Sequence, residues 1–339
     1  MPVPHLDIGT ARLVQLPPVR TRHQDFKVLV GEAGREVDDA WKAARRDRLL
    51  GVFDAERPAV VITELFPFGR RQMRFKLLPL LERARATEWA PKIISSMRDI
   101  LVTKPRADRN LEIAETVERF YDHLLIHGDE AVISLRQTFP LYDRIAAKVR
   151  YTGYVVTPAD GAPDDGAGAD EVLVSAGGGA VGRDYMRPVF EMRPSLPAQE
   201  KVWRFIGGHH LAPDTLEWMQ AQQTDLVRVE STVANLPARM ARAHLSISQA
   251  GYNTVMELMA TGAPAVVVPF EGGVETEQRL RADLLASRGS LQVVTEDNLT
   301  PETLSAAMDA ALKTDRTQLE VDLRGSQTTS ALVAQLMAR

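Results

Sequence analysis

Short apolar runs alternate with longer amphipathic stretches along most of this chain. In the first half, four apolar runs predict buried strands: Ala11–Leu16, Ala59–Thr63, Lys92–Ser96 and His123–Ile126. Between them, Glu32–Phe53 and Gln72–Ala86 carry apolar residues at helical spacing. Strands that alternate with helices predict a parallel sheet covered by helices on both faces, which is the α/β class.

The composition changes at residues 157–170 (TPADGAPDDGAGAD), which hold no large apolar residue and predict a loop or linker. Tyr151–Val156 is expected to be the strand that leads out of the first domain. Beyond the linker the pattern predicts five further strands: Glu171–Ser175, Lys201–Gly207, Leu226–Glu230, His244–Ser248 and Ala265–Pro269. It also predicts three helices: Tyr252–Thr261, Thr276–Ser287 and Ser326–Arg339.

The length of 339 residues favours two domains, because single cores rarely grow beyond about 250–300 residues. We therefore expect a Rossmann-like N-terminal domain at 1–156, a linker at 157–170 and a second domain at 171–325. Residues 326–339 are expected to form a closing helix.

Bulk properties exclude several classes of protein. Lys and Arg total 41 and Asp and Glu total 45, a net charge of -4, which argues against a nucleic-acid partner. The absence of cysteine excludes disulfides, thiolate nucleophiles and Cys-ligated metals. No apolar run approaches the ~20 residues of a membrane-spanning helix, and Met1–Arg12 lacks the order of a signal peptide. A cytoplasmic protein is expected.

Two glycine-containing turns follow predicted strands. The first includes Gly177, Gly178 and Gly179, and glycines allow amide N–H groups to approach a phosphate at a helix N-terminus. It matches neither G-x-G-x-x-G nor G-x-x-x-x-G-K-[ST], so a simple tight turn is the alternative. The second contains Gly251 and opens the helix that begins at Tyr252.

Polar residues gather around this second turn. Ser248, Asn253 and Thr254 supply short polar groups at the start of the helix, and Glu257 follows about one turn later. A carboxylate at that place suits a bidentate hold on a ribose diol. The alternative is a capped helix with a solvated glutamate.

Glu277 and Gln278 follow the last predicted strand of the second half. This places them at the carboxyl edge of the sheet, where open α/β sheets bind ligands. Their side chains are suited to sugar hydroxyl groups, and ordinary solvated surface residues are the alternative.

Residues 66–85 (FPFGRRQMRFKLLPLLERAR) mix aromatic, leucine and basic side chains. Such a segment is suited to peripheral contact with an anionic lipid surface, at the inner face of the membrane, and to presenting a lipid-linked molecule. The alternative is an ordinary amphipathic helix after a loop.

In this order the motifs resemble the C-terminal domain of GT-B glycosyltransferases, especially glycosyltransferase family 28, which includes the lipid-linked N-acetylglucosaminyltransferase of peptidoglycan synthesis. The resemblance covers Glu171–Leu312. Its most specific part is Ser248–Gln278, with S-x-A-G-x-x-T-x-x-E, then G-x-P-x-x-x-x-P-F, then the E-Q pair. Glu64–Leu81, His127–Asp129 and Tyr151–Val155 are similar to segments of bacterial predicted glycosyltransferases.

The resemblance implies two Rossmann-like domains facing across a cleft, with the acceptor side in the first and a nucleotide-sugar donor in the second. It implies that Gly177–Gly179 and Ser248–Thr254 border the diphosphate and that Glu257 holds the ribose. It further implies Glu277 and Gln278 at the donor sugar. The resemblance also places Arg228 near the nucleobase of the donor. All of these roles are assigned by position in the sequence.

The implied reaction transfers a sugar from a nucleoside-diphosphate donor, expected to be UDP-linked, to a hydroxyl of an unidentified small-molecule or lipid-linked acceptor. The nucleotide sugar is a substrate, so neither a cofactor nor a metal is expected. The alternatives are a nucleotide-sugar 2-epimerase of GT-B fold and a non-catalytic nucleotide-sugar-binding protein.

An inverting transfer needs one base for the acceptor hydroxyl. Glu64, Asp99 and Asp129 each follow a predicted strand and are candidates, although acidic residues at such places are also common helix N-caps. His127 is expected to be a core histidine with its hydrogen bonds satisfied.

The family pattern opens with a strand, a Gly-rich loop containing a histidine, and a helix. This sequence opens with Met1–His5 (MPVPH) instead. We therefore expect the N-terminal domain to be incomplete at its start, through an internal start methionine or as a natural short form.

Overall fold

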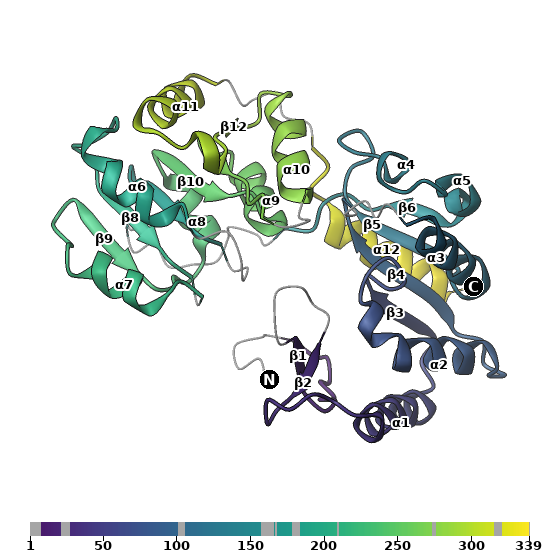
Figure 1. Cartoon of the computed structure of the whole chain (residues 1–339). Helices are drawn as coiled ribbons and strands as arrows, with labels where there is room; N and C mark the ends of the chain where they lie inside the picture. The colour runs from purple at the N-terminus through teal and green to yellow at the C-terminus, as the bar shows by residue number, and fades with distance from the viewer. Residues whose placement is uncertain are drawn as a thin grey trace.

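The computed structural model describes residues 8–21, 28–100, 106–156, 166, 168–177, 184–208, 210–272, 276–314 and 321–338. Two α/β domains lie side by side, each built around its own parallel sheet (Figure 1). The last helix, α12 (Gly325–Met337), returns from the second domain to lie against the first (Figure 1).

The first domain contains a four-stranded parallel sheet in the order β3-β4-β5-β6. Its strands are β3 (Val60–Glu64), β4 (Lys92–Arg98), β5 (His123–His127) and β6 (Val149–Tyr151). Its helical elements are α1 (Asp39–Glu56), η1 (Arg71–Met73), α2 (Arg74–Arg85), α3 (Ala107–Phe120), α4 (Leu135–Thr138), α5 (Tyr142–Ile145) and η2 (Ala146–Lys148). Because all four strands are parallel, their carboxyl ends share one edge.

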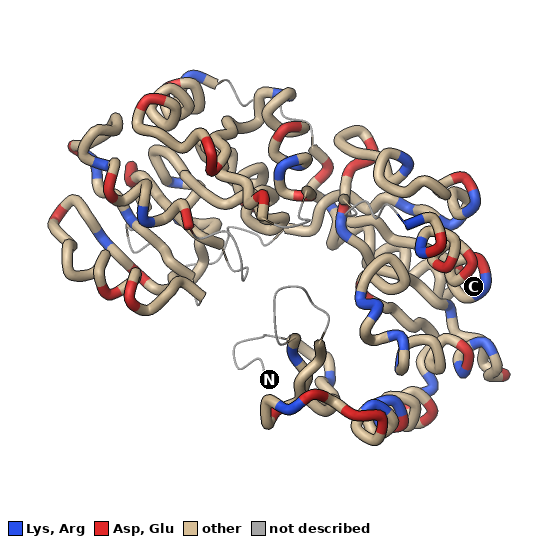
Figure 2. Tube along the Cα trace, viewed as in Figure 1, with Lys and Arg blue, Asp and Glu red and all other residues tan. Residues whose placement is uncertain are grey.

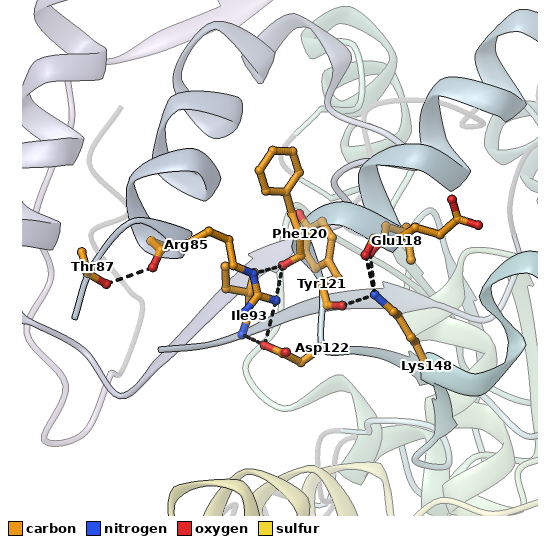
Figure 3. A network of polar contacts seen from close by, with 10 residues as sticks. Arg85, Thr87, Ile93, Glu118, Phe120, Tyr121, Asp122 and Lys148 are labelled. Carbon is orange, nitrogen blue, oxygen red and sulfur yellow. Dashed lines mark hydrogen bonds and ion pairs between the residues drawn. The ribbon is translucent and has the colours of Figure 1, made fainter. Parts of the chain in front are cut away.

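One polar network fixes helices α2 and α3 to this sheet (Figure 3). The Arg85 guanidinium, at the end of α2, donates to the Phe120 carbonyl at 2.6 Å and pairs with Asp122 at 3.1 Å. Lys148 donates to the carbonyls of Val117, Glu118 and Tyr121, which end α3, at distances of 2.6–3.0 Å. A cation at a helix C-terminus satisfies carbonyls that lack partners within the helix.

A small antiparallel ribbon, β1 (Val19–Thr21) with β2 (Leu29–Gly31), precedes α1. The strand predicted at Ala11–Leu16 is wrong, since residues 11–18 form no strand. Leu13 is 60% exposed, so this segment has no sheet to join, and an unpaired strand is not stable in water. Helix α1 begins at Asp39 rather than near Glu32, because Asp38 caps it by accepting from the Trp41 amide at 2.7 Å.

The second domain contains a six-stranded parallel sheet in the order β12-β11-β10-β7-β8-β9. Its strands are β7 (Val172–Ser175), β8 (Trp203–Ile206), β9 (Val227–Glu230), β10 (Leu245–Gln249), β11 (Ala265–Val268) and β12 (Gln292–Val293). Its helical elements are α6 (Met186–Met192), η3 (Arg193–Ser195), α7 (Pro213–Gln220), α8 (Leu236–Arg242), α9 (Tyr252–Thr261), α10 (Glu277–Ala286), η4 (Glu296–Asn298) and α11 (Pro301–Lys313).

The order of these six strands defines a doubly wound sheet. Counted along the chain, the third, second and first strands lie on one side and the fourth, fifth and sixth on the other. Residues of β7, β10 and β11 are fully buried, because helices cover both faces, and alternate side chains belong to two separate apolar clusters. The α/β class predicted from the apolar runs is therefore confirmed.

The two domains are joined closely where the chain crosses back into α12. The Tyr154 amide donates to the Asp322 carbonyl at 2.7 Å, and the Gly325 amide donates to the Tyr154 carbonyl at 3.0 Å. A Cβ atom on Gly325 would lie 2.6 Å from the Gly153 and Tyr154 carbonyl oxygens, so only glycine permits this crossing.

Charged residues of both signs are interspersed along the described chain (Figure 2). Among the described helices, none is both long enough and apolar enough to span a membrane.

Candidate functional site

The second sheet has its topological switch point between β7 and β10, which are hydrogen-bonded neighbours. The chain leaves these two strands toward opposite halves of the sheet, and open α/β sheets bind ligands in the crevice that results. Gly177 follows β7 and Gly251 follows β10. Two of the motifs found in the sequence therefore meet at this place.

Gly177 lies directly against the start of α9. Its φ is +67°, and a Cβ atom there would lie 3.2 Å from the Thr254 hydroxyl and 3.8 Å from the Gln249 side-chain oxygen. Gly208, after β8, approaches the Gly177 carbonyl closely as well. The backbone here is compact and free of bulky side chains, as close approach to a ligand requires. Gly178 and Gly179 lie outside the described residues.

Helix α9 begins at the switch point with Gly251 as its N-cap. A Cβ atom on Gly251 would meet no atom within 4 Å, so its surroundings are open. Asn253 is exposed, whereas Thr254 is buried against Gly177. The first amide groups of a helix lack partners within it and attract anions, so this arrangement suits a phosphate.

Ser248 lies beneath this crevice. It is fully buried, and its hydroxyl lies 3.1 Å from that of Ser175 and 2.8 Å from that of Ser246. These contacts join the ends of β7 and β10. Ser248 therefore fixes the switch point and presents no free hydroxyl toward a ligand.

Glu257 follows Thr254 by three residues, so both lie on the same side of α9. Its carboxylate is half-buried and has no hydrogen-bond partner among the described residues. Burial raises the pKa of Glu257 to about 7, because desolvation disfavours the charged form. A half-buried carboxylate without a hydrogen-bond partner among the described residues has acceptor capacity that a ribose diol would satisfy.

Glu277 and Gln278 open helix α10 beside the loop that follows β11. Gln278 is buried, and its side-chain oxygen accepts from the Phe270 amide at 3.2 Å. This bond ties the Gln278 side chain to the loop after β11. Glu277 is the first residue of α10 and is partly exposed.

Arg228 is not brought to this group of residues. It lies on β9, the outer strand, and β8 separates β9 from β7. Its guanidinium is half-exposed and lies 3.8 Å from the Asp225 carboxylate.

The three candidate bases of the first domain have different surroundings. Asp99 is buried, and both its oxygens accept from Arg281 at 2.9 and 3.1 Å. Asp129 accepts from the amides of Ala131 and Asp322 at 2.8 and 3.1 Å. Glu64 accepts from Arg70 at 3.1 and 3.2 Å and is exposed. Glu64 is the most exposed of the three, since Asp129 is partly exposed and Asp99 is buried.

His127 is a core histidine with both ring nitrogens satisfied, as expected. One nitrogen lies 2.8 Å from the Ser96 hydroxyl and the other 3.0 Å from the Thr152 hydroxyl. Burial lowers its pKa, which keeps the ring neutral.

The lipid-surface hypothesis for residues 66–85 stays a prediction, with Phe75 as the partly exposed aromatic residue of the segment. Phe66 and Phe68 are each 4% exposed and belong to the core of the first domain. The exposed residues of this segment are charged, four arginines and Glu82, a pattern that also fits the alternative of an ordinary amphipathic helix after a loop.

Sequence reasoning missed Tyr252 and Arg281, which connect the second domain to the first. The Tyr252 hydroxyl donates to the His127 carbonyl at 2.8 Å and accepts from the Val155 amide at 3.3 Å. Their partners lie more than ninety residues away in sequence, and local patterns carry no signal for such pairs. Among the described residues, no group of three or more His, Asp or Glu side chains forms a metal site.

The arrangement of two α/β domains, each built on a parallel sheet, is the GT-B fold, and comparison with solved structures confirms it. The calicheamicin glycosyltransferase CalG4 superposes with a TM-score of 0.57 at 14% identity, over 88% of this chain and 78% of that one. A Listeria monocytogenes protein described as a candidate UDP-N-acetylglucosamine 2-epimerase superposes with a TM-score of 0.53 at 14% identity, over 88% and 80%. At these identities the similarity establishes the fold alone.

The family follows from the sequence of the second domain. Residues 172–337 match the glycosyltransferase family 28 C-terminal domain. One relative is the UDP-N-acetylglucosamine–N-acetylmuramyl-(pentapeptide) pyrophosphoryl-undecaprenol N-acetylglucosamine transferase of Brucella suis, 30% identical over 177 residues. The match covers 49% of this chain and 46% of that protein, so the chain spans about half the length of this relative.

Proposed function

We propose that this protein is a glycosyltransferase that transfers a sugar from a UDP-linked donor to an acceptor hydroxyl. The donor nucleotide occupies the switch point of the second sheet. The proposal agrees with the family of the second domain and with the UDP-sugar in the name of the Brucella relative.

A single observation carries this proposal. Gly177, the start of α9 and the unpartnered carboxylate of Glu257 lie together at the place where the strand order reverses. Amides of the Gly177 loop and of α9 bind the diphosphate, and Glu257 accepts hydrogen bonds from the ribose hydroxyls. Gln278 and Glu277 face the sugar.

The same groups supply the chemistry of transfer. Breaking the bond between sugar and diphosphate leaves negative charge on the departing phosphate oxygens. Fixed N–H groups that already point at those oxygens stabilise this charge without reorganising. Glu64 takes the proton of the acceptor hydroxyl, since its carboxylate is exposed at the edge of the first sheet.

The acceptor is a separate question. The Brucella relative acts on an undecaprenol-linked molecule by name, and a lipid-linked acceptor is one proposal for this chain. Such an acceptor places the enzyme at the inner face of the membrane.

Calorimetry with UDP tests the donor site. We expect Glu257→Ala to weaken UDP binding by at least ~1.5 kcal/mol, the size of a charge-assisted hydrogen bond. Glu217→Ala, on the exposed side of α7, is the matched control and should bind UDP like the unchanged protein. Equal affinity in the Glu257 variant would refute the proposed role.

Product analysis separates transfer from epimerisation. A 2-epimerase converts UDP-N-acetylglucosamine without any acceptor, whereas a transferase requires one. Release of UDP together with an epimerised sugar from the donor alone would contradict the proposal.

A further inference from the structure

An arginine of the first domain lies at the start of helix α9, where the proposed donor site begins. Arg98 is the last residue of β4, and its guanidinium carbon lies over the Tyr252 ring, 5.4 Å from the ring centre. Tyr252 is the first residue of α9. Arg98 therefore extends across the boundary between the domains, from the first sheet to the helix that we assign to the diphosphate.

The Tyr252 side chain spans the same boundary and directs Arg98. Its hydroxyl donates to the His127 carbonyl at 2.8 Å, and His127 is the residue opposite Arg98 in the β4–β5 pairing. The stem of Arg98 thus starts beside the hydroxyl end of the ring, and its guanidinium lies over the face. A cation over an aromatic face is attracted by the ring electrons, so the ring holds the guanidinium at the start of α9.

The backbone that carries Arg98 is fixed. The next residue, Asp99, is buried, and its two carboxylate oxygens accept from Arg281 of α10 at 2.9 and 3.1 Å. A Cβ atom on Gly128 would lie 2.8 Å from the Asp99 Cβ, so the end of β5 packs directly against this turn. A cation on a fixed backbone loses less conformational entropy when a ligand binds, which favours affinity.

The charge of Arg98 is not neutralised by a carboxylate. Its side chain is exposed, and no Asp or Glu among the described residues pairs with it. The arginines of α10 differ in this respect, since Arg281 is bound to Asp99 and Arg279 pairs with Asp283 at 2.7 Å. Arg98 is therefore the arginine at this boundary that keeps its charge for a ligand.

The departing diphosphate is the group that needs such a charge. When the bond between the sugar C1 carbon and the β-phosphate oxygen breaks, the electron pair stays on that oxygen. The acceptor oxygen forms the new bond to C1, and its proton goes to Glu64. Amides at the start of a helix offer only partial positive charge, whereas Arg98 offers a full charge and several N–H donors in one plane.

We propose that Arg98 binds the β-phosphate of the donor and stabilises the charge that this phosphate gains when the sugar leaves. The β-phosphate lies between Arg98 and the amides of α9, so both domains contribute to one anion site. This inference rests on the proposed function, because it requires the diphosphate at the start of α9.

Calorimetry with UDP and UMP tests this role, because UMP lacks the β-phosphate. We expect Arg98→Gln to weaken UDP binding about tenfold or more, the effect of losing a charge-assisted hydrogen bond, and to leave UMP binding unchanged. Arg98→Lys keeps the positive charge and should recover part of the lost UDP affinity. Because Arg98 is exposed, both replacements leave the core intact.

Arg119→Gln is the matched control. Arg119 is also an exposed arginine of the first domain over an aromatic ring, with its guanidinium carbon 4.6 Å from the centre of the Phe120 ring. This variant should bind UDP and UMP like the unchanged protein. Equal losses of UDP and UMP affinity in Arg98→Gln would overturn the assignment of Arg98 to the β-phosphate, and so would equal losses of UDP affinity in the Arg98 and Arg119 variants.

The unchanged protein separates this inference from the proposed function. If it binds UDP and Arg98→Gln binds UDP equally well, the role of Arg98 fails and the glycosyltransferase proposal stands. If the unchanged protein binds neither UDP nor UMP, the proposed function fails, and the role of Arg98 fails with it.

Discussion

Asp99 and Arg281 form a bidentate ion pair between the two domains, although 182 residues separate them in sequence. Their side chains are 1% and 0% exposed, and Arg281 also donates to the Ala250 carbonyl at 3.3 Å. The pair connects the end of β4 to α10 and to the turn before α9. The first domain thus holds the two helices on which the proposed donor site depends.

We predict that Arg281→Met destabilises the protein by about 3–5 kcal/mol, because it leaves the Asp99 carboxylate buried without a partner. The double variant Asp99→Leu with Arg281→Met should recover most of this loss. Urea unfolding measures both. A loss below about 1 kcal/mol in the single variant would mean that water reaches Asp99 and the domains are not held by this pair.

We predict that UDP binding depends on the ionisation of Glu257. Its pKa of about 7 lies above the ordinary 4.5, so the carboxylate is increasingly protonated below pH 7. UDP affinity should fall about tenfold per pH unit between pH 7 and pH 5, because a protonated carboxyl accepts fewer hydrogen bonds. In Glu257→Gln this pH dependence should disappear, and its persistence would assign it to another group.

The same residue affects stability in the opposite sense. Since the pKa of Glu257 is raised in the folded state, the folded protein binds more protons between pH 4.5 and about 7. The stability that protonated Glu257 contributes is complete below pH 4.5 and is lost as the pH rises through about 7. We therefore expect Glu257→Gln to be more stable than the unchanged protein at pH 8, which thermal unfolding without UDP would show.

Lys76 and Arg45 place like charges together between α2 and α1. Burial and the neighbouring Arg45 lower the pKa of Lys76 from 10.5 to about 8. Between pH 8 and 10.5 the unfolded chain therefore binds more protons than the folded chain does. The folded protein loses stability as the pH falls from 10.5 through 8, because protonating the Lys76 amine is less favourable in the folded state.

We predict that Lys76→Met raises the free energy of unfolding at pH 7 by about 1 kcal/mol, a moderate value because the amine is partly solvated. The gain should vanish above pH 10.5, where the amine is neutral in both states. Lys313→Met, at the exposed end of α11, is the control and should have little effect. Denaturant unfolding at both pH values checks this, and an unchanged stability at pH 7 would show that an anion neutralises the pair.

Glu64 is the proposed base, and its replacement tests that role. We predict that Glu64→Gln lowers kcat by about 100-fold or more with UDP-sugar and acceptor, as loss of a general base does. UDP affinity should stay unchanged, because Glu64 lies in the other domain. Glu88→Gln, on the surface after α2, should keep full activity. Comparable turnover in both variants would exclude Glu64.

Much of the second domain was predictable from its sequence. The runs that became β7, β10 and β11 are rich in apolar residues, with buried serines confined to β7 and β10, and α9 has the predicted bounds of Tyr252 and Thr261. A strand buried on both faces is mostly apolar, which makes it visible in sequence. The carboxyl-edge positions of Gly177 and Glu257 follow from those strands.

Side-chain partners were not predictable in the same way. Asp99 and Asp129 have the same place after a strand as Glu64, yet only Glu64 remains exposed. Their different surroundings depend on Arg281 and on the Asp322 amide, which folding brings from distant parts of the chain. Ser248 likewise bonds to Ser175 across two strands, which no local pattern indicates.

The most direct test of the account is a crystal structure of this protein with bound UDP. We expect the diphosphate at the amides of Gly177 and the first turn of α9, with the ribose hydroxyls within about 3.2 Å of the Glu257 carboxylate. UDP bound away from the β7–β10 switch point, or a ribose without contact to Glu257, would contradict it.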